Sequence, residues 1–278
     1  FDILRAPVFF IENKKNLGFA GGNNQALREI LQNDKYEFCA LLNADTAVDP
    51  HWLSSLIAVM QSDSSIGAAQ SLILLNDARD TINTDGNKLH YLGFGWSGNY
   101  LQRLGAYEHT SIPIGYASGA AVLYRVRALR AVGLFDEKLF MYHEDLELSW
   151  RMRLAGYRIV LAPRSRVYHK YEFSRNRKKW FWVERNRLAV CCMLYKKRTL
   201  VLLFPAFLCA EIGIIAYSIF DRWFLMKLRS YGGFILFLPH IFARRARVSD
   251  FRRVSDREIL DAMVGNFSFP KIKNSLVQ

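Results

Sequence analysis

One nearly uncharged run limits what this chain can fold into. The run is Thr199–Phe220, and Glu211 is its only charged residue. As an α-helix it would be about 33 Å long, and the hydrocarbon core of a bilayer is about 30 Å thick. Apolar side chains of this number must leave water, so the run predicts a helix buried either in a protein core or in a membrane.

Basic residues flank this run on both sides. They are Lys196, Lys197 and Arg198 before it, and Arg222, Lys227 and Arg229 after it. A shorter apolar run, Tyr231–Phe242, follows. Each cation near an anionic bilayer gains roughly 1 kcal/mol, so the pattern favours association with an anionic membrane, by spanning it or by lying in its interface. The alternative is a buried helix pair of a soluble domain, which Pro205 and Glu211 favour.

The positive charge of the chain is concentrated in its second part. Residues 1–150 carry 12 basic and 17 acidic side chains, whereas residues 151–278 carry 26 basic and 8 acidic ones. Nucleic acid and an anionic membrane would both attract the basic part. Its basic residues bracket apolar runs and accompany no recognition helix or stacking motif, so we expect no nucleic-acid partner. The four cysteines have no CxxC spacing, which argues against a structural zinc site.

The part of the chain before the basic region alternates between strands and helices. The glycine-rich segment Asn16–Asn24 leads into a predicted helix at 25–32. A buried strand at 38–42 precedes a helix at 50–61, and a later helix opens at Glu144. Short links between elements of this kind predict an α/β domain with a largely parallel sheet.

Three polar positions lie where an α/β fold places its ligands. Asp45 follows the strand at 38–42, where a carboxylate can hold a divalent cation against a diphosphate. Glu144 and Asp145 open a helix, where a carboxylate can act as a general base. His169 follows the last strand, and histidine is a common metal ligand. Each position also has a structural alternative, namely a turn or cap for the acids and packing for the histidine.

Five short segments follow one another in a characteristic order. They are Asn16–Asn23, Leu42–Pro50, Ser118–Ala121, Gly133–Glu137 and Phe140–Leu148. Together they closely resemble family 2 glycosyltransferases, and within that family the rhamnosyltransferase-like branch. The resemblance covers roughly residues 8–170.

This resemblance implies a GT-A fold with a mostly parallel sheet in residues 1–175, followed by membrane-associating helices in residues 176–278. The implied reaction is inverting transfer of a sugar, with rhamnose as one candidate, from a nucleotide-diphosphate donor such as a dTDP- or UDP-sugar. The implied acceptor is a lipid-linked or cell-surface glycan. The implied location is the cytoplasmic face of the inner membrane, as a peripheral or integral protein.

The resemblance also assigns roles to individual residues. Asp145 matches the catalytic base, and Asp45 matches the last carboxylate of the metal-binding DxD motif, which binds Mg²⁺ or Mn²⁺. Asn43 stands where many members have the first carboxylate of that motif. His169 is similar to a histidine that completes metal coordination in some relatives. The nucleotide pocket would be bordered by Asn16, Gly18, Gly21, Gly22, Asn23, Asn43 and Asp45.

The sequence departs from the family pattern at its start. The family begins with a strand, a helix and a second strand whose aspartate binds the base, whereas this sequence starts at Phe1 beyond that unit. We therefore expect an N-terminally truncated domain that lacks half of the nucleotide pocket. The alternative function is a catalytically inactive fragment that acts as a binding or scaffold module in glycan assembly.

Overall fold

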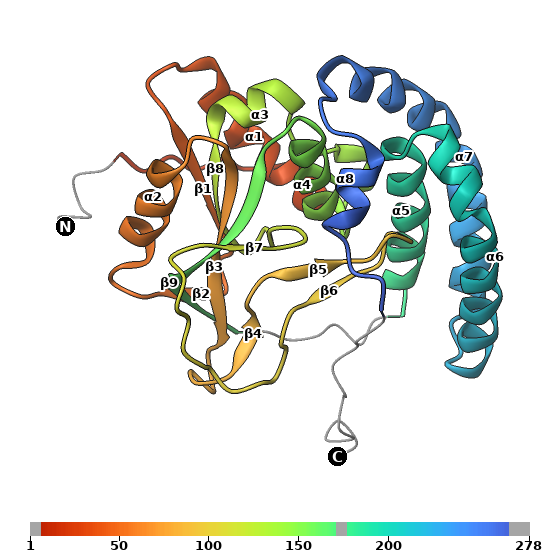
Figure 1. Ribbon diagram of the computed structural model, residues 1–278, viewed down its shortest axis with the longest axis horizontal. Coiled ribbons are helices and arrows are strands. Elements are labelled where there is room, and N and C mark those ends of the chain that lie inside the picture. Colours follow the sequence, from red (N-terminus) through yellow and green to blue (C-terminus); the bar gives the residue numbers. More distant parts are fainter. Residues whose placement is uncertain (1–6, 171–176, 267–278) are drawn as a thin grey trace.

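Figure 1 shows the computed structural model, which describes residues 7–170 and 177–266. A central sheet with helices on both faces forms one side of the molecule, and long helices form the other. The strands are β1 (Phe38–Leu42), β2 (Thr46–Val48), β3 (Ile66–Leu75), β4 (Ile82–Thr84), β5 (Asn87–Leu89), β6 (Gly95–Ser97), β7 (Ile112–Pro113), β8 (Ala121–Arg125) and β9 (Arg158–His169). The helices are α1 (Gly18–Gln32), α2 (Trp52–Ser62), α3 (Val126–Val132), the 3₁₀ turn η2 (Glu137–Leu139), α4 (Glu144–Leu154), α5 (Lys179–Leu194), α6 (Lys197–Phe220), α7 (Phe224–Phe251) and α8 (Asp256–Asp261).

The main sheet has the strand order β1-β8-β3-β9-β2, with β4 paired to β3 and β7 paired to β9. This confirms the predicted α/β class with a central sheet. The expectation of a mostly parallel sheet is wrong for the described residues, because β3 and β9 form the one parallel pair among them. The reason is that β8 runs between β1 and β3 and antiparallel to both. Strands β1, β3 and β9 therefore share a direction, although most of the hydrogen-bonded neighbours do not.

Helices cover both faces of this sheet, and the side-chain alternation of β3 shows how. Ala68 and Leu72 face a core that also contains apolar residues of α1, α3 and α4. Ala69, on the opposite face, packs with residues of α2 such as Leu56 and Met60. Every residue of β3 except Leu75 is buried. A strand covered on both faces is mostly apolar, and Ile66–Leu75 fits that description apart from Gln70 and Ser71, whose buried side chains are hydrogen-bonded.

Helix α1 begins earlier than predicted. We expected a glycine-rich loop followed by a helix at 25–32, but the helix starts at Gly18. Ala20, Gly21, Asn24 and Leu27 are buried at helical spacing, so the glycine-rich segment supplies part of the face that packs on the core. The glycines remain helical here because tertiary packing overrides their weak helix propensity.

The long helices pack against the sheet domain through α5. Tyr195, at the end of α5, makes an edge-to-face contact with Trp150 of α4, with ring centroids 4.7 Å apart. Helix α7 packs beside α5, and α6 lies at the outer edge of the molecule (Figure 1). The domain boundary expected between residues 175 and 176 falls outside the described residues.

Candidate active site

Asp45 and His169 meet at the edge of the sheet where β1 and β9 end. The Nε2 atom of His169 lies 3.2 Å from Oδ1 of Asp45. Their approach is fixed by the backbone, because Thr46 of β2 pairs with His169 and the amide of Lys170 donates to the carbonyl of Asp45 at 3.0 Å. The side chain of Asp45 is 53% exposed, whereas that of His169 is buried. The pair therefore presents a carboxylate to solvent with an imidazole behind it.

This pair could contribute to a divalent metal site. A carboxylate oxygen and an imidazole nitrogen are both ligands of ions such as Mn²⁺. Asn83 lies behind the histidine, with its Oδ1 atom 3.3 Å from Nδ1 of His169. Within residues 7–170 and 177–266, no three His, Cys, Asp or Glu side chains gather in metal-binding range. An ion held by Asp45 and His169 would take its remaining ligands from donor phosphates or water, so the two residues fit a substrate-completed site.

Asn43 connects the end of β1 to the segment before β8. Its amide donates to the carbonyl of Ala120 at 2.9 Å, and its carbonyl accepts from the Thr46 hydroxyl at 2.6 Å. These bonds close the turn that carries Asp45. They also connect the turn to the segment before β8, where Gly119 approaches the predicted base.

Asp145 lies at the start of α4 and faces that segment. Its Oδ2 atom is 3.4 Å from the amide nitrogen of Gly119, and its Oδ1 atom accepts from the amide of Leu146 at 2.7 Å. Burial raises the pKa of the Asp145 carboxyl to about 6, although both backbone amides lower it. Asp145 is therefore ionised at neutral pH but close to the range in which it can exchange a proton.

The neighbouring acid, Glu144, has a different environment. Its side chain is buried, and its Oε2 atom has no hydrogen-bond partner among the described residues. Burial, together with the charge of Asp145, raises the pKa of Glu144 well above its usual value. Loss of a proton from Glu144 is therefore disfavoured beside the Asp145 carboxylate.

The loop before α4 has an unusual backbone. Phe140, Tyr142 and His143 have φ angles of 68°, 64° and 67°, in the left-handed region that non-glycine residues seldom adopt. The side-chain amide of Asn186, on α5, donates to the carbonyls of Leu139, Met141 and Tyr142 at 3.0, 3.0 and 2.7 Å. Asn186 is fully buried, so the hydrogen bonds that hold the strained loop come from inside the protein, on α5.

His143 adds a second attachment for this loop. Its Nε2 atom lies 3.1 Å from the carbonyl oxygen of Gly93. Burial lowers the pKa of His143 to about 4, so the imidazole is neutral at neutral pH. Its Nε2–H group donates a hydrogen bond to that carbonyl. The loop and the start of α4 are therefore fixed from two directions, which positions Asp145.

The glycine-rich segment packs directly against these parts. A Cβ atom on Gly18 would lie 2.2 Å from the carbonyl oxygen of Phe140, and the backbone of Gly18 has a φ of 70°. Phe19 covers Gly119, where an added Cβ would lie 2.4 Å from the ring. The absence of side chains at Gly18 and Gly119 thus allows α1 to lie directly beside the loop before α4.

The other predicted residues of this segment have local roles. Asn16 accepts from the amide of Gly18 at 2.8 Å, and Asn23 donates to the carbonyl of Phe19 at 2.9 Å. Gly21 packs on Leu17, whereas nothing lies within 4 Å of a Cβ on Gly22. That these residues border a nucleotide pocket stays a prediction.

Sequence reasoning missed three contributors to this site. They are the amide of Gly119, the side chain of Asn83 and the side chain of Asn186. The small residues at Ser118–Ala121 gave a signal for the first, since they indicate close backbone approach. The other two are single asparagines in unremarkable surroundings, and only the tertiary structure brings them to the site.

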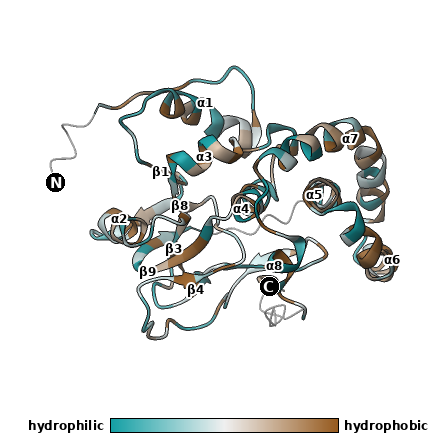
Figure 2. Cartoon of the chain, turned by 45° about the horizontal axis from the view of Figure 1, so that its top comes forward, coloured by the Kyte–Doolittle hydropathy of each residue, from teal (hydrophilic) through white to brown (hydrophobic). Residues whose placement is uncertain are grey.

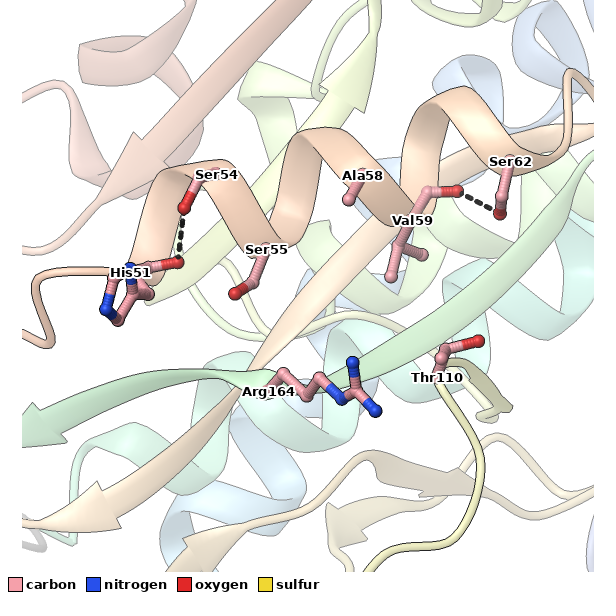
Figure 3. A pocket seen from close by; sticks show the side chains of 8 residues that line it. All are labelled: His51, Ser54, Ser55, Ala58, Val59, Ser62, Thr110 and Arg164. Carbon is pink, nitrogen blue, oxygen red and sulfur yellow. Dashed lines mark hydrogen bonds between the residues drawn. The ribbon is translucent and has the colours of Figure 1, made fainter.

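Two cavities lie away from these residues. The larger, of about 360 Å³, lies between α2 and β9, and Figure 3 shows the Arg164 side chain extending below the helix toward Thr110. A second, of about 310 Å³, lies beside the start of α3. None of the predicted site residues lines either cavity.

The α/β domain thus holds Asp45 and His169 at its strand ends and Asp145 at the start of α4. The family described as "Glycosyl transferase family group 2" matches residues 38–243 of the chain. The chain therefore belongs to this family.

Curated relatives agree with that assignment. The chain is 25% identical over 150 residues to the low-salt glycan biosynthesis hexosyltransferase Agl10 of Haloferax volcanii, covering 52% of this chain and 46% of the relative. It is 38% identical over 82 residues to an N-acetylglucosaminyl-diphospho-decaprenol L-rhamnosyltransferase of Mycobacterium tuberculosis, covering 30% and 26%. It is 27% identical over 157 residues to a poly-beta-1,6-N-acetyl-D-glucosamine synthase of Staphylococcus aureus, covering 55% and 34%. The matches thus span less than half the length of these relatives.

The chain also aligns with parts of solved structures. GalNAc-T7 with UDP, GalNAc and Mn²⁺ aligns with a TM-score of 0.49 and 18% identity, over 67% of this chain and 36% of that one. TarS of S. aureus aligns with a TM-score of 0.48 and 16% identity, over 90% and 44%.

Proposed function

We propose that this chain is an inverting glycosyltransferase that moves a sugar from a nucleotide-diphosphate donor to a lipid-linked or cell-surface glycan. Residues 1–175 would form the catalytic domain and residues 176–278 a membrane-associating region. One observation carries the proposal: Asp145 accepts from the amide of Gly119, Asn43 donates to the adjacent Ala120, and the turn after Asn43 carries Asp45 to His169. A base and a phosphate-side cation site are the two groups that this reaction needs.

Asp145 would act as the base. In inverting transfer, the acceptor hydroxyl attacks the anomeric carbon while the nucleotide diphosphate leaves from the opposite face. The Asp145 carboxylate takes the hydroxyl proton as the new bond forms, which is worth roughly 10²–10⁴ in rate. The raised pKa of about 6 suits this role, because the carboxylate is ionised at neutral pH and is more basic than an exposed aspartate.

Asp45 and His169 would hold a divalent cation, Mg²⁺ or Mn²⁺, when the donor is bound. The ion supplies neutralising charge to the diphosphate. Asp45 is open to solvent and therefore accessible to phosphate oxygens, and His169 orients the carboxylate from behind. Asn43 fixes the turn between them through its backbone bonds.

We propose a dTDP- or UDP-linked sugar as the donor, with rhamnose as the transferred sugar. The support for rhamnose is the relative named as a rhamnosyltransferase, at 38% identity over 82 residues. That relative is named for an N-acetylglucosaminyl-diphospho-decaprenol acceptor, which supports a lipid-linked acceptor for this chain. Such an acceptor places the reaction at a membrane, and we propose the cytoplasmic face of the inner membrane.

Donor binding tests this proposal. Calorimetry of the purified protein with dTDP-rhamnose and UDP-sugars, each with and without Mn²⁺, should show metal-dependent binding of one donor. A folded sample that binds none of them would favour the alternative function, an inactive scaffold module in glycan assembly.

A further inference from the structure

Helix α6 presents an apolar face that no described part of the chain covers. Over Thr199–Phe220, all of which the structure describes, the outward side carries no charged side chain. Its large apolar residues are between 51% and 87% exposed: Val201, Leu202, Phe204, Leu208, Ile212, Tyr217, Ile219 and Phe220. A patch of this kind on a folded protein marks an interaction surface.

The neighbouring helix extends this surface. Helix α7 exposes the apolar side chains Leu225, Leu228, Ile235, Leu236 and Phe242. Figure 2 shows α6 and stretches of α7 in brown at the side of the molecule away from the sheet. We call these exposed residues of α6 and α7 the apolar surface.

The opposite side of α6 is attached to the body of the protein near both ends and in the middle. Near its start, the amide of Lys196 donates to Asp256 of α8 at 2.7 Å. Just beyond its end, Trp223 is buried and stacks on Trp180 of α5, with ring centroids 4.9 Å apart. Between these points Leu203 and Phe207 pack against the core that contains α5 and α7.

A buried cluster of charges holds the middle of the helix. Glu211, the one charged residue of the apolar run, points inward and pairs with Arg187 of α5. It also accepts from Lys227 at 2.7 Å and from the Tyr231 hydroxyl at 2.5 Å, both on α7. Arg187 and Lys227 are fully buried and also bind Glu184, at 2.9 and 2.5 Å. Lys227 was expected to flank a membrane segment, and it serves instead as an internal partner of Glu211.

The cluster connects α6 to the catalytic side of the molecule. Burial alone would raise the pKa of Glu184, but Arg187 and Lys227 lower it to about 2, so Glu184 is ionised at neutral pH. Arg187 also donates to the carbonyl of Leu92 at 3.2 Å. Separating α6 from α5 and α7 would break the ion pairs that Glu211 makes with Arg187 and Lys227, which is unfavourable. Helix α6 therefore stays beside the body.

A helix attached in this way has protein on one side. If it crossed a bilayer, its two ends would lie on opposite sides, and the elements packed beside it would have to enter the hydrocarbon as well. Helix α6 has one free face, and exposed basic residues stand at both ends: Lys196, Lys197 and Arg198 at the start, Arg222 and Arg229 beyond the end. Cations at both ends suit a helix whose two ends meet the same layer of anionic headgroups.

From these observations we infer that the apolar surface of α6 and α7 docks onto an anionic lipid bilayer with α6 lying in the plane of the membrane, so that the chain binds one face and does not cross. The inference deepens the proposed function and rests on it only for the identity of the acceptor. The tests below need no sugar donor, so their failure is distinguishable from a failure of the transfer assay.

The first test measures binding to vesicles. Full-length protein should sediment with vesicles of phosphatidylcholine and phosphatidylglycerol in equal parts, and Leu208→Glu should weaken the binding by about tenfold or more because it inserts a charge among the lipid chains. Leu53→Glu is the matched control, since Leu53 is 42% exposed on α2, away from the surface. Equal binding of the two variants would overturn the inference. A Leu208→Glu variant that changes from dimer to monomer without loss of vesicle binding would also overturn it, since a second copy would then cover the surface.

The second test measures orientation. In a Cys209→Ser background, Lys197→Cys and Arg222→Cys each place a thiol at an exposed position near one end of α6. A membrane-impermeant maleimide added outside sealed vesicles should label both variants, and detergent should not increase the labelling. Labelling of one variant only, with the other released by detergent, would show a spanning helix and overturn the inference.

Discussion

Two adjacent carboxyl groups, Glu144 and Asp145, show how this chain divides acid strengths between neighbouring residues. Glu144 is enclosed and without a partner for Oε2 in the described structure, and burial together with the charge of Asp145 raises its pKa. Asp145 accepts hydrogen bonds from two backbone amides, which favour its charged form. Hydrogen bonding, as well as position in the motif, therefore favours Asp145 over Glu144 as the proposed base.

This division predicts the pH dependence of transfer. A base with a raised pKa of about 6 works when ionised, so kcat/KM should be constant above that pH and fall about tenfold per pH unit below it. The measurement is the rate profile from about pH 5 to about pH 8 at saturating metal. Glu144→Gln should keep most of the activity, and a profile that stays flat down to pH 5 would contradict the assignment.

Two glycines of α1 give a matched test of how this helix packs against the loop before α4. Gly18→Ala places a methyl group against the Phe140 carbonyl at a φ of 70°, so it should lower the free energy of unfolding by about 2 kcal/mol or more. Gly22→Ala meets no atom within 4 Å and should leave stability unchanged or raise it by about 0.5–1 kcal/mol. Urea unfolding of both variants measures the difference. Equal stabilities would show that α1 does not pack here as described.

The Asp45–His169 pair predicts a graded loss of metal dependence. Asp45→Ala should remove metal-dependent donor binding, because the solvent-facing ligand is lost, whereas His169→Ala should weaken it less. Calorimetric titration of Mn²⁺ and donor measures both effects. If His169→Ala titrates with Mn²⁺ like the wild type, His169 does not contribute to the metal site. If a chelator leaves the donor affinity of the wild type unchanged, Asp45 does not hold a metal ion for the donor.

At the scale of elements, the loop before α4 depends on α5, a helix that comes later in the chain, after β9. Asn186 of α5 bonds three carbonyls of the strained loop. Asn186→Ala should cost about 1–3 kcal/mol of stability and lower kcat more than it changes KM, because the base loses its fixed position. Asn23→Ala is the control for stability, since Asn23 bonds only within its own helix. Loss of stability with an unchanged kcat would limit Asn186 to a structural role.

The elements also show what the sequence could predict. The strand at 38–42, the helix beginning at Glu144 and the apolar helix of α6 were predicted because apolar periodicity and helix-start signals are local. The direction of β8 was not, because Ala121–Arg125 is apolar on both faces, and such a strand fits a parallel or an antiparallel neighbour equally well. The start of α1 was missed because glycine weakens the helical pattern locally, and only the packing of Ala20 and Gly21 on the core restores it.

At the scale of the whole molecule, the long helices and the sheet domain form one connected structure. Asp136, before η2, pairs with His240 and Arg244 of α7, and Arg244 also pairs with Glu147 of α4. The helix that carries Asp145 is thus tied to the helices that carry the apolar surface. The sequence predicted the acids and the histidine of the site from ordered motifs. It could not predict these connections, because each joins single charged residues far apart in the chain.

The proposed base, Asp145, can be tested by a single substitution. Asp145→Asn keeps the shape of the side chain and removes the basic oxygen. Donor affinity should stay within about twofold while the transfer rate falls by about two orders of magnitude or more. Near wild-type transfer by Asp145→Asn, in a sample whose donor affinity is unchanged, would show that Asp145 is not the base.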